Sequence, residues 1–469
     1  MSVWYWRHGS PPARRPIDTG GVLSLRGIRG RLLSFLRAPR GAGDAQSYRY
    51  IDDGIVAVND DGRIEAAGPT AEVATRLPAD IPVERHPGAL IMPGFIDPHI
   101  HYPQTQVIAS YGAQLLEWLE KYTFVEEQKF ADPAHAARNA EFFLDELARN
   151  GTTTAVAYCT AHPASAEALF TAAHKRNAGV IAGNAVMNRN GPPGLLAPAP
   201  TAIADSRDLI RRWHGTGRQR YAVTPRFAIT STEAQLAELG ALLKEYPTTL
   251  MQTHLDENLN EIAAIKKLFP VDASYTAVYG RFGLLGPRSL MGHCIHLTDA
   301  EVALLRDTQS VAVFCPTSNL FIGSGLFDYE RLNAAGVRIA LATDVGGGTS
   351  YSMLRTAAEA YKVMQLQGQN LPALAAFDLM TRRNAAALGL EQEIGSIAPG
   401  VYADLVVLDA RATPAMAHRM EMARDLEEEL FVLMTMGDDR AVRQTYIAGE
   451  PALPARLART RISPSSSAL

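Results

Sequence analysis

Between residue 90 and about residue 390 the sequence alternates short apolar runs with amphipathic stretches, and this alternation limits the fold most. The apolar runs that follow the first one, Leu90–Ile96, are Thr152–Tyr158, Gly179–Val186, Arg220–Pro225, Thr249–His254, Ser289–His293, Ser310–Cys315 and Arg338–Asp344. The helix-like stretches include Ala134–Arg149, Ser165–Asn177, Thr232–Glu245 and Asp299–Arg306, with polar starts at Ser231-Thr232 and Thr298-Asp299. Eight strands in βα alternation predict an α/β fold, a (β/α)8 TIM-type barrel.

The two ends of the chain carry a different pattern, in which strand-like runs are bounded by turns. Ile51–Gly68 predicts a hairpin, because Asp-Gly between alternating runs is a strong hairpin signal. Gly400–Leu408 and Val442–Gly449 predict further strands. We expect both ends to form one small β-sandwich-like domain beside the barrel. The expected organisation is a disordered tail at 1–20, a composite β domain at 21–89 plus 391–452, the barrel at 90–390 and a second tail at 453–469.

Composition limits the class of partner. The 469 residues carry a formal net charge of −4, so the charge does not point to nucleic acid or to an anionic membrane. Three scattered cysteines, Cys159, Cys294 and Cys315, are too few for a disulfide framework and favour a reducing compartment. No apolar run approaches the ~20 residues that span a bilayer, and residues 1–20 lack the apolar centre of a secretory signal. We expect a cytoplasmic protein that binds neither nucleic acid nor a membrane.

Metal-binding side chains fall at the carboxyl ends of the predicted strands. His99 and His101 follow the first run and share one face, because side chains alternate along a strand. Later runs end in His254, His293 and Asp344. The chemistry of such a barrel lies at the carboxyl ends of its strands, so we expect these five side chains to converge.

Imidazoles with one carboxylate are the ligands of a catalytic Zn²⁺ or Fe²⁺ site. We expect His99, His101, His254 and Asp344 to bind one such ion. A metal ion of this kind lowers the pKa of its water toward neutrality, and Asp344 can accept the proton that the water loses.

Two further side chains are candidates for proton transfer and charge stabilisation. Glu257 follows His254 by three residues and can pass a proton to a ring nitrogen and then to a leaving group. Asp256 competes for this role, and the spacing favours Glu257. His293 is either a fourth metal ligand or the group that stabilises the hydroxide and the tetrahedral centre; we favour the second role.

At these positions the sequence resembles the amidohydrolase superfamily. The motifs are Pro93-Gly-Phe-Ile-Asp-Pro-His-Ile-His101, the His254-x-x-Glu257 spacing, Gly292-His293 and Thr343-Asp344. No lysine ends the run Arg220–Pro225 to bridge two metal ions, which is typical of the mononuclear, deaminase-like branch. Within that branch the sequence is similar to the guanine deaminases from about residue 22 to residue 452. This similarity is carried by Ile100–Gln104, Leu115–Phe124, Val223–Phe227, Phe314–Leu320, Leu341–Met353 and Leu430–Asp439.

The resemblance implies a hydrolase that converts guanine to xanthine and ammonia in purine catabolism or salvage. The implied substrate-binding residues are Gln104, Arg226, Phe227, His254, Glu257 and Asp344. A glutamine and an arginine can hydrogen-bond a purine edge, and Phe227 offers a stacking face. The resemblance also implies one Zn²⁺ per subunit and a homodimer, although the ligand set equally suits Fe²⁺.

Other functions remain open at this point. A related deaminase or chlorohydrolase acting on cytosine, a triazine or a pterin shares the metal ligands, so only Gln104, Arg226 and Phe227 discriminate. A non-catalytic scaffold with the same barrel is expected to lack a ligand or Glu257, and all of them are present. The stretch Met187–Gly194 departs from the resemblance, since relatives often carry an acidic residue and fewer Pro and Gly there. A role for this loop in closing the site stays open.

Overall fold

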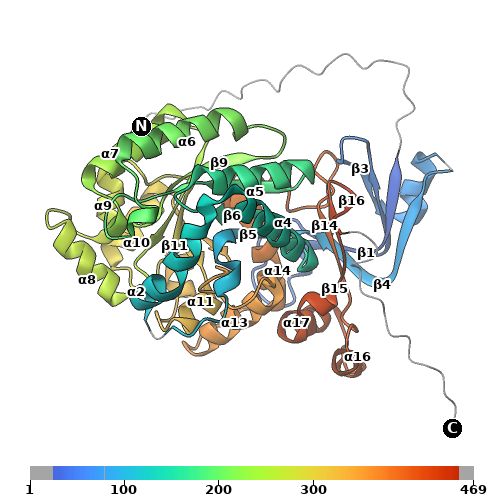
Figure 1. Cartoon of the computed structure of the whole chain (residues 1–469). Helices are drawn as coiled ribbons and strands as arrows, with labels where there is room; N and C mark the ends of the chain where they lie inside the picture. Colours follow the sequence, from blue (N-terminus) through green and yellow to red (C-terminus); the bar gives the residue numbers. More distant parts are fainter. Residues whose placement is uncertain (1–24, 79, 113, 454–469) are drawn as a thin grey trace, which may run out of the picture.

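A barrel of parallel strands makes up the larger part of the computed structural model, which describes residues 25–78, 80–112 and 114–453 (Figure 1). Its strands are β5 (Phe95–His101), β6 (Thr152–Tyr158), β7 (Gly179–Gly183), β8 (Ala185–Val186), β9 (Arg220–Pro225), β10 (Leu250–Leu255), β11 (Ser289–His293), β12 (Val311–Phe314) and β13 (Arg338–Leu341). β7 and β8 share one position, because both pair with β9. The N–H of Asp344 donates to the carbonyl of His99 at 2.9 Å, which joins the chain after β13 to β5. The predicted (β/α)8 barrel is confirmed.

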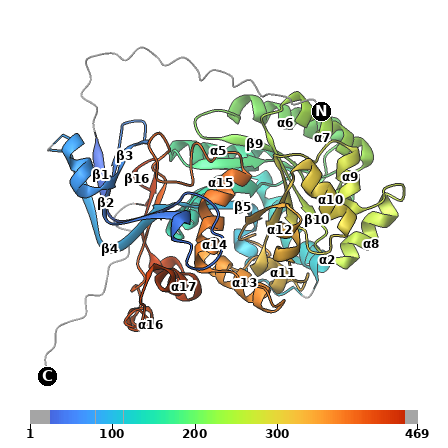
Figure 2. The same cartoon turned by 180° about the vertical axis from the view of Figure 1, so that it is seen from behind.

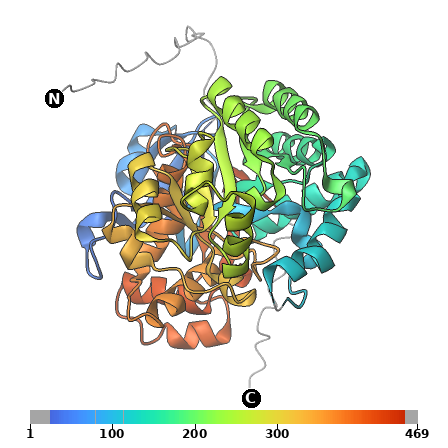
Figure 3. The ribbon, with the colours of Figure 1, turned by 90° about the vertical axis from the view of Figure 1, so that its left-hand side faces the viewer.

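Helices surround the barrel when it is viewed from the side away from the small sheet (Figure 3). The described helices are α1 (Thr70–Val73), α2 (Leu115–Trp118), α3 (Phe124–Glu127), α4 (Pro133–Arg149), α5 (Pro163–Lys175), α6 (Ala199–Trp213), α7 (Glu233–Glu245), α8 (Leu259–Leu268), α9 (Tyr275–Arg281), α10 (Asp299–Thr308), α11 (Pro316–Phe321), α12 (Tyr329–Ala334), α13 (Met353–Gln365), α14 (Ala373–Asp378), α15 (Asn384–Ala387), α16 (Pro414–Arg419) and α17 (Leu426–Met436). Of these, α1 belongs to the smaller unit, where it packs on β2 and β3. The expected helix starts are present, since the hydroxyls of Thr232 and Thr298 cap α7 and α10.

A layer of apolar side chains fills the barrel interior. Its members on the strands are Ile96, Val156, Ile181, Ala222, Leu250, Leu290, Val311, Val313 and Ala340. Each side chain is buried, and burying one Val, Leu or Ile contributes about 1.5–3 kcal/mol. The interior is therefore a packed core, and polar chemistry is left to the carboxyl ends of the strands.

The second unit is a single seven-stranded sheet in the order β16-β15-β14-β4-β1-β2-β3, beside the barrel (Figure 2). Its strands are β1 (Arg26–Phe35), β2 (Tyr48–Val58), β3 (Ile64–Pro69), β4 (Val83–Pro93), β14 (Leu405–Leu408), β15 (Val442–Ile447) and β16 (Glu450–Pro451). The two ends of the chain meet where Leu90 of β4 pairs with Leu408 of β14.

The described strands of this unit form one sheet, which curls as the sandwich-like expectation requires. Ile64 at the start of β3 exchanges backbone hydrogen bonds with Val401 and Gly400 just before β14, both at 2.8 Å. One face carries its own apolar cluster, which includes Ile28, Val56 and Leu405. Leu33 and Met92 instead join the large cluster that the barrel helices share. Both faces are thus covered without a second sheet.

The junction between the two units lies at Gly94. The sequence predicts one strand over Leu90–Ile96 with a kink at Pro93-Gly94; in the structure β4 ends at Pro93 in the small sheet and β5 begins at Phe95 in the barrel. The N–H of Gly94 donates to the carbonyl of Asp404 at 2.9 Å. The buried carboxylate of Asp404 in turn binds Arg218, with Nη1 2.9 Å from Oδ1.

Two expectations lie outside what the structure shows. The tails expected at 1–20 and beyond residue 453 fall outside the described residues. Among the described helices, none combines the length and the apolar character that crossing a membrane requires.

Candidate active site

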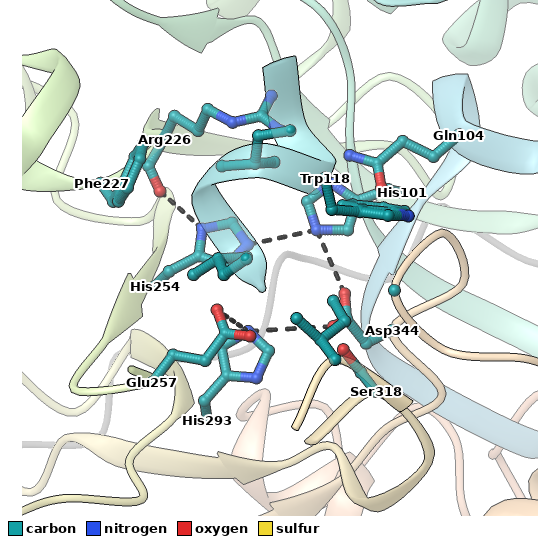
Figure 4. A pocket seen from close by; sticks show the side chains of 14 residues that line it. His101, Gln104, Trp118, Arg226, Phe227, His254, Glu257, His293, Ser318 and Asp344 are labelled. Atoms are coloured by element: carbon teal, nitrogen blue, oxygen red, sulfur yellow. Dashed lines mark hydrogen bonds and ion pairs between the residues drawn. The ribbon is translucent and has the colours of Figure 1, made fainter. Parts of the chain in front are cut away.

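The five side chains expected at the strand ends come together. His99 and His101 project from the end of β5, and their Nε2 atoms lie 3.3 Å and 3.2 Å from Asp344 Oδ1. The Nε2 atom of His254, at the end of β10, lies 3.2 Å from Nε2 of His101. The Nε2 atom of His293, at the end of β11, lies 3.8 Å from Asp344 Oδ2. Side chains at or just beyond the carboxyl ends of four strands therefore converge, and Figure 4 shows His101, His254, His293 and Asp344 of this group.

The backbone at two of these strand ends is strained. His293 has φ +73° and Asp344 has φ +51°, conformations that residues other than glycine rarely adopt. Such strain persists where the surrounding structure enforces it, and it clusters at functional sites. Gly292 makes room for the site, since a Cβ at this position would lie 2.5 Å from Cε1 of His99.

The arrangement fits a metal ion. His99 Nδ1, His99 Nε2 and His101 Nδ1 are buried without a hydrogen-bond partner among the described residues. The ring of His254 donates from Nδ1 to the carbonyl of Arg226 at 2.6 Å, so its unprotonated Nε2 faces His101 Nε2. A cation bound between these two nitrogens would take a lone pair from each ring. Buried polar groups without partners and converging lone pairs are the features of a ligand set.

The electrostatics keep the imidazoles of His101 and His254 neutral, as metal ligation requires. Burial lowers the pKa of His101 to about 4, although Asp344 opposes the shift. Burial also lowers the pKa of His254 well below its ordinary value, and the neighbouring histidines add to this effect. Burial alone would raise the pKa of Asp344, but the nearby His99 and His101 hold it well below its usual range.

Two sets of ligand atoms meet the distance requirement of a metal site. The candidate atoms of His99, His254 and His293 lie within 4.8 Å of one another, and so do those of His99, Cys315 and Asp344. The sets share His99. The buried thiol of Cys315 was not expected, because its run ends in Phe-Cys-Pro without a second cysteine nearby. His101 completes the group through its contacts with Asp344 and His254.

Glu257 lies beside the metal-ligand group and against His293. Its Oε2 is 3.3 Å from His293 Nε2, and its Oε1 accepts a hydrogen bond from Ser324 at 3.1 Å. Burial raises the pKa of Glu257 to about 8, and the charge of Asp344 adds to the shift. On its other side, His293 Nδ1 donates to Asn319 Oδ1 at 2.9 Å, which leaves Nε2 free to accept. Glu257 is thus placed to hold a proton.

The loop that carries Glu257 is fixed by a buried acid that sequence reasoning missed. Glu261 Oε2 accepts the backbone N–H groups of Glu257 at 3.0 Å and Asn258 at 3.2 Å. Its Oε1 accepts from the hydroxyl of Tyr275 at 2.9 Å. The signal was available, because Asn258 followed by Glu261 is the spacing of a capping box at the start of α8.

The expected purine-binding residues line a pocket above this group. Gln104, Arg226 and Phe227 form part of its wall, and His101, His254, Glu257, His293 and Asp344 form its inner end. Apolar side chains from one helical segment, Leu115, Trp118 and Leu119, line it as well. Figure 4 shows Trp118 beside His101 and Gln104. The pocket holds about 390 Å³ of space, part of it open to solvent. Flat apolar walls with a few polar groups suit a planar heterocycle.

The helical segment over the pocket contains a π turn. α2 continues through the π turn Leu119–Thr123 into α3, which ends at Glu127. Such turns occur mostly as single insertions and often at functional sites. Glu127 is 1% exposed and contacts both Gln104 and Arg226. This residue was also missed, because Glu126, Glu127 and Lys129 together look like a solvated charged surface.

The loop Met187–Gly194 packs on the segment that follows β9. Arg189 donates to the carbonyls of Ala228 and Ile229, each at 3.1 Å. The N–H of Asn188 donates to the carbonyl of Thr230 at 2.9 Å. No residue of this loop is among the lining residues of the pocket. The loop therefore supports the segment that follows Arg226 and Phe227 without contacting the pocket itself.

Comparison with known proteins agrees with this geometry. Residues 90–452 match the amidohydrolase family, and the chain belongs to that family. Among its members, the chain is similar to guanine deaminase of Escherichia coli, with 44% identity over 92% of this chain and 98% of that protein. The solved structure of the E. coli enzyme has a TM-score of 0.89 at 43% identity, covering 91% of this chain and 99% of the other. A guanine deaminase from C. acetobutylicum, solved with guanine bound in its active site, has a TM-score of 0.80 at 27% identity, covering 91% and 99%.

Proposed function

We propose that this protein is a guanine deaminase, a hydrolase that converts guanine and water to xanthine and ammonia. The main observation behind the proposal is that a single pocket has polar side chains at both of its ends. Gln104 and Arg226 can hydrogen-bond an edge of a purine, while Glu257 lies with the ligand-type side chains at the other end. The similarity to the E. coli guanine deaminase over nearly the full length of both chains supports the same substrate.

The ligand set proposed for the metal ion is His99, His101, His254 and Asp344, with one Zn²⁺ per subunit. Neutral imidazoles and one carboxylate also suit Fe²⁺, so the element is assigned by measuring metal content. When bound, the ion supplies a Lewis acid that lowers the pKa of water toward neutrality. Cys315 stays outside the proposed set, because its Sγ donates to the backbone carbonyl of Val313 at 3.6 Å.

The pocket residues hold the ring. Arg226 donates to O6 of guanine, Gln104 accepts from N1–H, and Phe227 packs against the ring. The exocyclic amine on C2 then points toward Glu257 and His293. Trp118 and Leu119 cover the ring and exclude water from the reacting carbon.

The proton steps belong to three side chains. Asp344 accepts a proton from the attacking water, and Glu257 protonates ring nitrogen N3 as C2 becomes tetrahedral. His293 accepts a hydrogen bond from the hydroxyl of the tetrahedral centre at Nε2, and Asn319 orients its ring. Asp344 then delivers the proton taken from the water to the departing amine, and the C2 hydroxyl returns a proton to Glu257 as the new carbonyl forms. The elements of water replace ammonia, so atoms and charge balance.

The alternative is another nitrogen heterocycle as the substrate: cytosine, a triazine or a pterin. A test measures ammonia release from guanine and from each of these rings at equal concentrations. We expect kcat/KM for guanine to exceed each of the others by at least about a hundredfold, because a site built to pair with one edge rejects others. Turnover of a triazine or cytosine without turnover of guanine would leave the metal chemistry in place and reject the proposed substrate.

We also propose that the enzyme is a cytoplasmic homodimer in purine catabolism or salvage. The charge and the few cysteines support the compartment, and the similarity to the guanine deaminases supports the pathway. Sedimentation at micromolar concentration tests the dimer, and a monomer mass would contradict it.

A further inference from the structure

A buried carboxylate lies behind the two side chains proposed to hold the purine edge. Glu127 Oε1 accepts from Gln104 Nε2 at 3.0 Å. The same carboxylate accepts from Arg226 Nη1, at 2.8 Å to Oε1 and 2.6 Å to Oε2. Glu127 is not among the lining residues of the pocket, so it acts only through the two residues in front of it.

The contact with Glu127 decides which way the amide of Gln104 faces. An ionised carboxylate accepts hydrogen bonds and cannot donate one, so only the NH₂ group of the amide can face it. The carbonyl oxygen Oε1 of Gln104 is then left over, and it takes no hydrogen bond from the described residues. Gly346 leaves the room that this oxygen occupies, since a Cβ at this residue would lie 2.0 Å from Oε1. Gln104 therefore presents a hydrogen-bond acceptor to the pocket.

The same carboxylate determines which N–H groups of Arg226 remain available as hydrogen-bond donors. Only Nη1 of Arg226 bonds to protein among the described residues, so Nε and Nη2 remain as donors. The guanidinium lies over the ring of Phe124, with Cζ 5.2 Å from its centre. Glu127 also cancels the charge of Arg226, which is 3% exposed. The pair presents one acceptor beside donors, with no net charge.

We propose that Glu127 is a positioning residue that determines specificity, because it orders Gln104 and Arg226 to read a lactam edge. A lactam places a C=O acceptor next to an N–H donor, which matches this order. An amidine edge places an amino donor next to a ring-nitrogen acceptor. Its amino group would then face the donors of Arg226, and its ring nitrogen would face the acceptor of Gln104. The inference rests on the proposed function in one respect: guanine presents such a lactam edge at O6 and N1.

The test compares guanine with 2,6-diaminopurine, which keeps the C2 amine and inverts the edge. Binding of both rings is measured by quenching of tryptophan fluorescence, since Trp118 lines the pocket, and turnover by ammonia release. Glu127→Gln frees the amide of Gln104 to rotate. We expect the preference for guanine to fall at least about tenfold in the variant, in Kd and in kcat/KM, with an absolute gain in binding of 2,6-diaminopurine.

Controls separate positioning from damage. Glu126→Gln removes the neighbouring buried acid, which bonds Lys129 and His135, and should leave the preference unchanged. Glu127→Asp keeps the charge that Arg226 needs and draws the carboxylate away from Gln104. It should lower the preference by a smaller factor, and it serves as the test if Glu127→Gln does not fold. Adding Gln104→Met should remove most of the effect of Glu127→Gln, because the effect acts through that amide.

The outcomes distinguish this inference from the proposed function. An equal loss of binding for both rings, with the preference unchanged, shows only structural damage and overturns the role of Glu127. A wild-type protein that binds guanine with the expected preference but releases no ammonia leaves the role of Glu127 in place and rejects the proposed reaction.

Discussion

The imidazole Nδ1 of His254 lies 2.6 Å from the backbone carbonyl oxygen of Arg226. The hydrogen bond fixes the ring so that Nε2 faces His101, and it ties the loop after β9 to the end of β10. A residue proposed to bind metal and a residue proposed to bind the purine are thus held in register through one backbone atom. A shift of either loop would move both ends of the pocket, which is how a rigid barrel positions a reaction.

Replacing the proposed proton carrier should separate turnover from metal binding. Glu257→Gln keeps the size and the contact with Ser324, but the amide cannot carry the proton. We expect kcat to fall by about 10²–10⁴, with metal content unchanged by elemental analysis. Glu233→Gln, at an exposed acid that pairs with Arg281, is the control and should behave as wild type. A Glu257→Gln enzyme within tenfold of the wild-type kcat would contradict the role.

Removing the metal should destabilise the protein as well as inactivate it. A ligand that binds only the folded state stabilises it by RT ln(1 + [L]/Kd), about 4 kcal/mol at a thousandfold excess over Kd. Chelation should therefore lower both Tm and activity, and Zn²⁺ should restore them. In His101→Ala, which lacks one proposed ligand, a chelator should have much less effect. A wild-type protein whose Tm is unmoved by complete metal removal would exclude this site.

The buried ion pair between the two structural units should be worth far more than a surface pair. Asp404→Asn leaves Arg218 buried without its countercharge, and such a loss costs about 3–5 kcal/mol of unfolding free energy. Glu245→Gln breaks the exposed pair with Arg207 and should cost less than about 1 kcal/mol. Urea unfolding gives both values. Similar small losses in the two variants would show that the junction is not held by this pair.

Stability should fall as the pH drops below about 6.5, in part through His86. Burial lowers the pKa of His86, whose ring lies 2.6 Å from the hydroxyl of Tyr446; Glu84 opposes the shift and Arg443 adds to it. The unfolded chain protonates this histidine first as the pH falls through about 6.5, so it binds more protons than the folded state and folding is penalised. The difference in Tm between wild type and His86→Gln should therefore shift in favour of the variant between pH 7.5 and pH 5. A constant difference would contradict the assignment.

The strands that carry the candidate site could be predicted from the sequence because two signals coincide at each strand end. An apolar run sets the strand, and a His or Asp directly after it sets the face, as with His254 after Leu250–Thr253. Alternation along β5 was enough to predict that His99 and His101 act together. The chemistry of the group then follows from the residue types.

The parts that the sequence did not reveal depend on partners far along the chain. Glu127 is buried because Arg226, 99 positions later, pairs with it, and no local pattern records that contact. The run Leu90–Ile96 predicts a kink at Pro93-Gly94, but no local pattern records that its two halves join different sheets. The pairing of Leu90 with Leu408 that makes the small unit one sheet is likewise a long-range register.

The central claim is hydrolysis at C2 of guanine, and oxygen labelling tests it most directly. Metal-replete protein is incubated with guanine in ¹⁸O-labelled water, and ammonia and xanthine are quantified together by mass spectrometry. The account predicts one ammonia per xanthine and one ¹⁸O atom in each xanthine, at the carbon that carried the amine. Unchanged guanine, or ammonia formed without labelled xanthine, would contradict it.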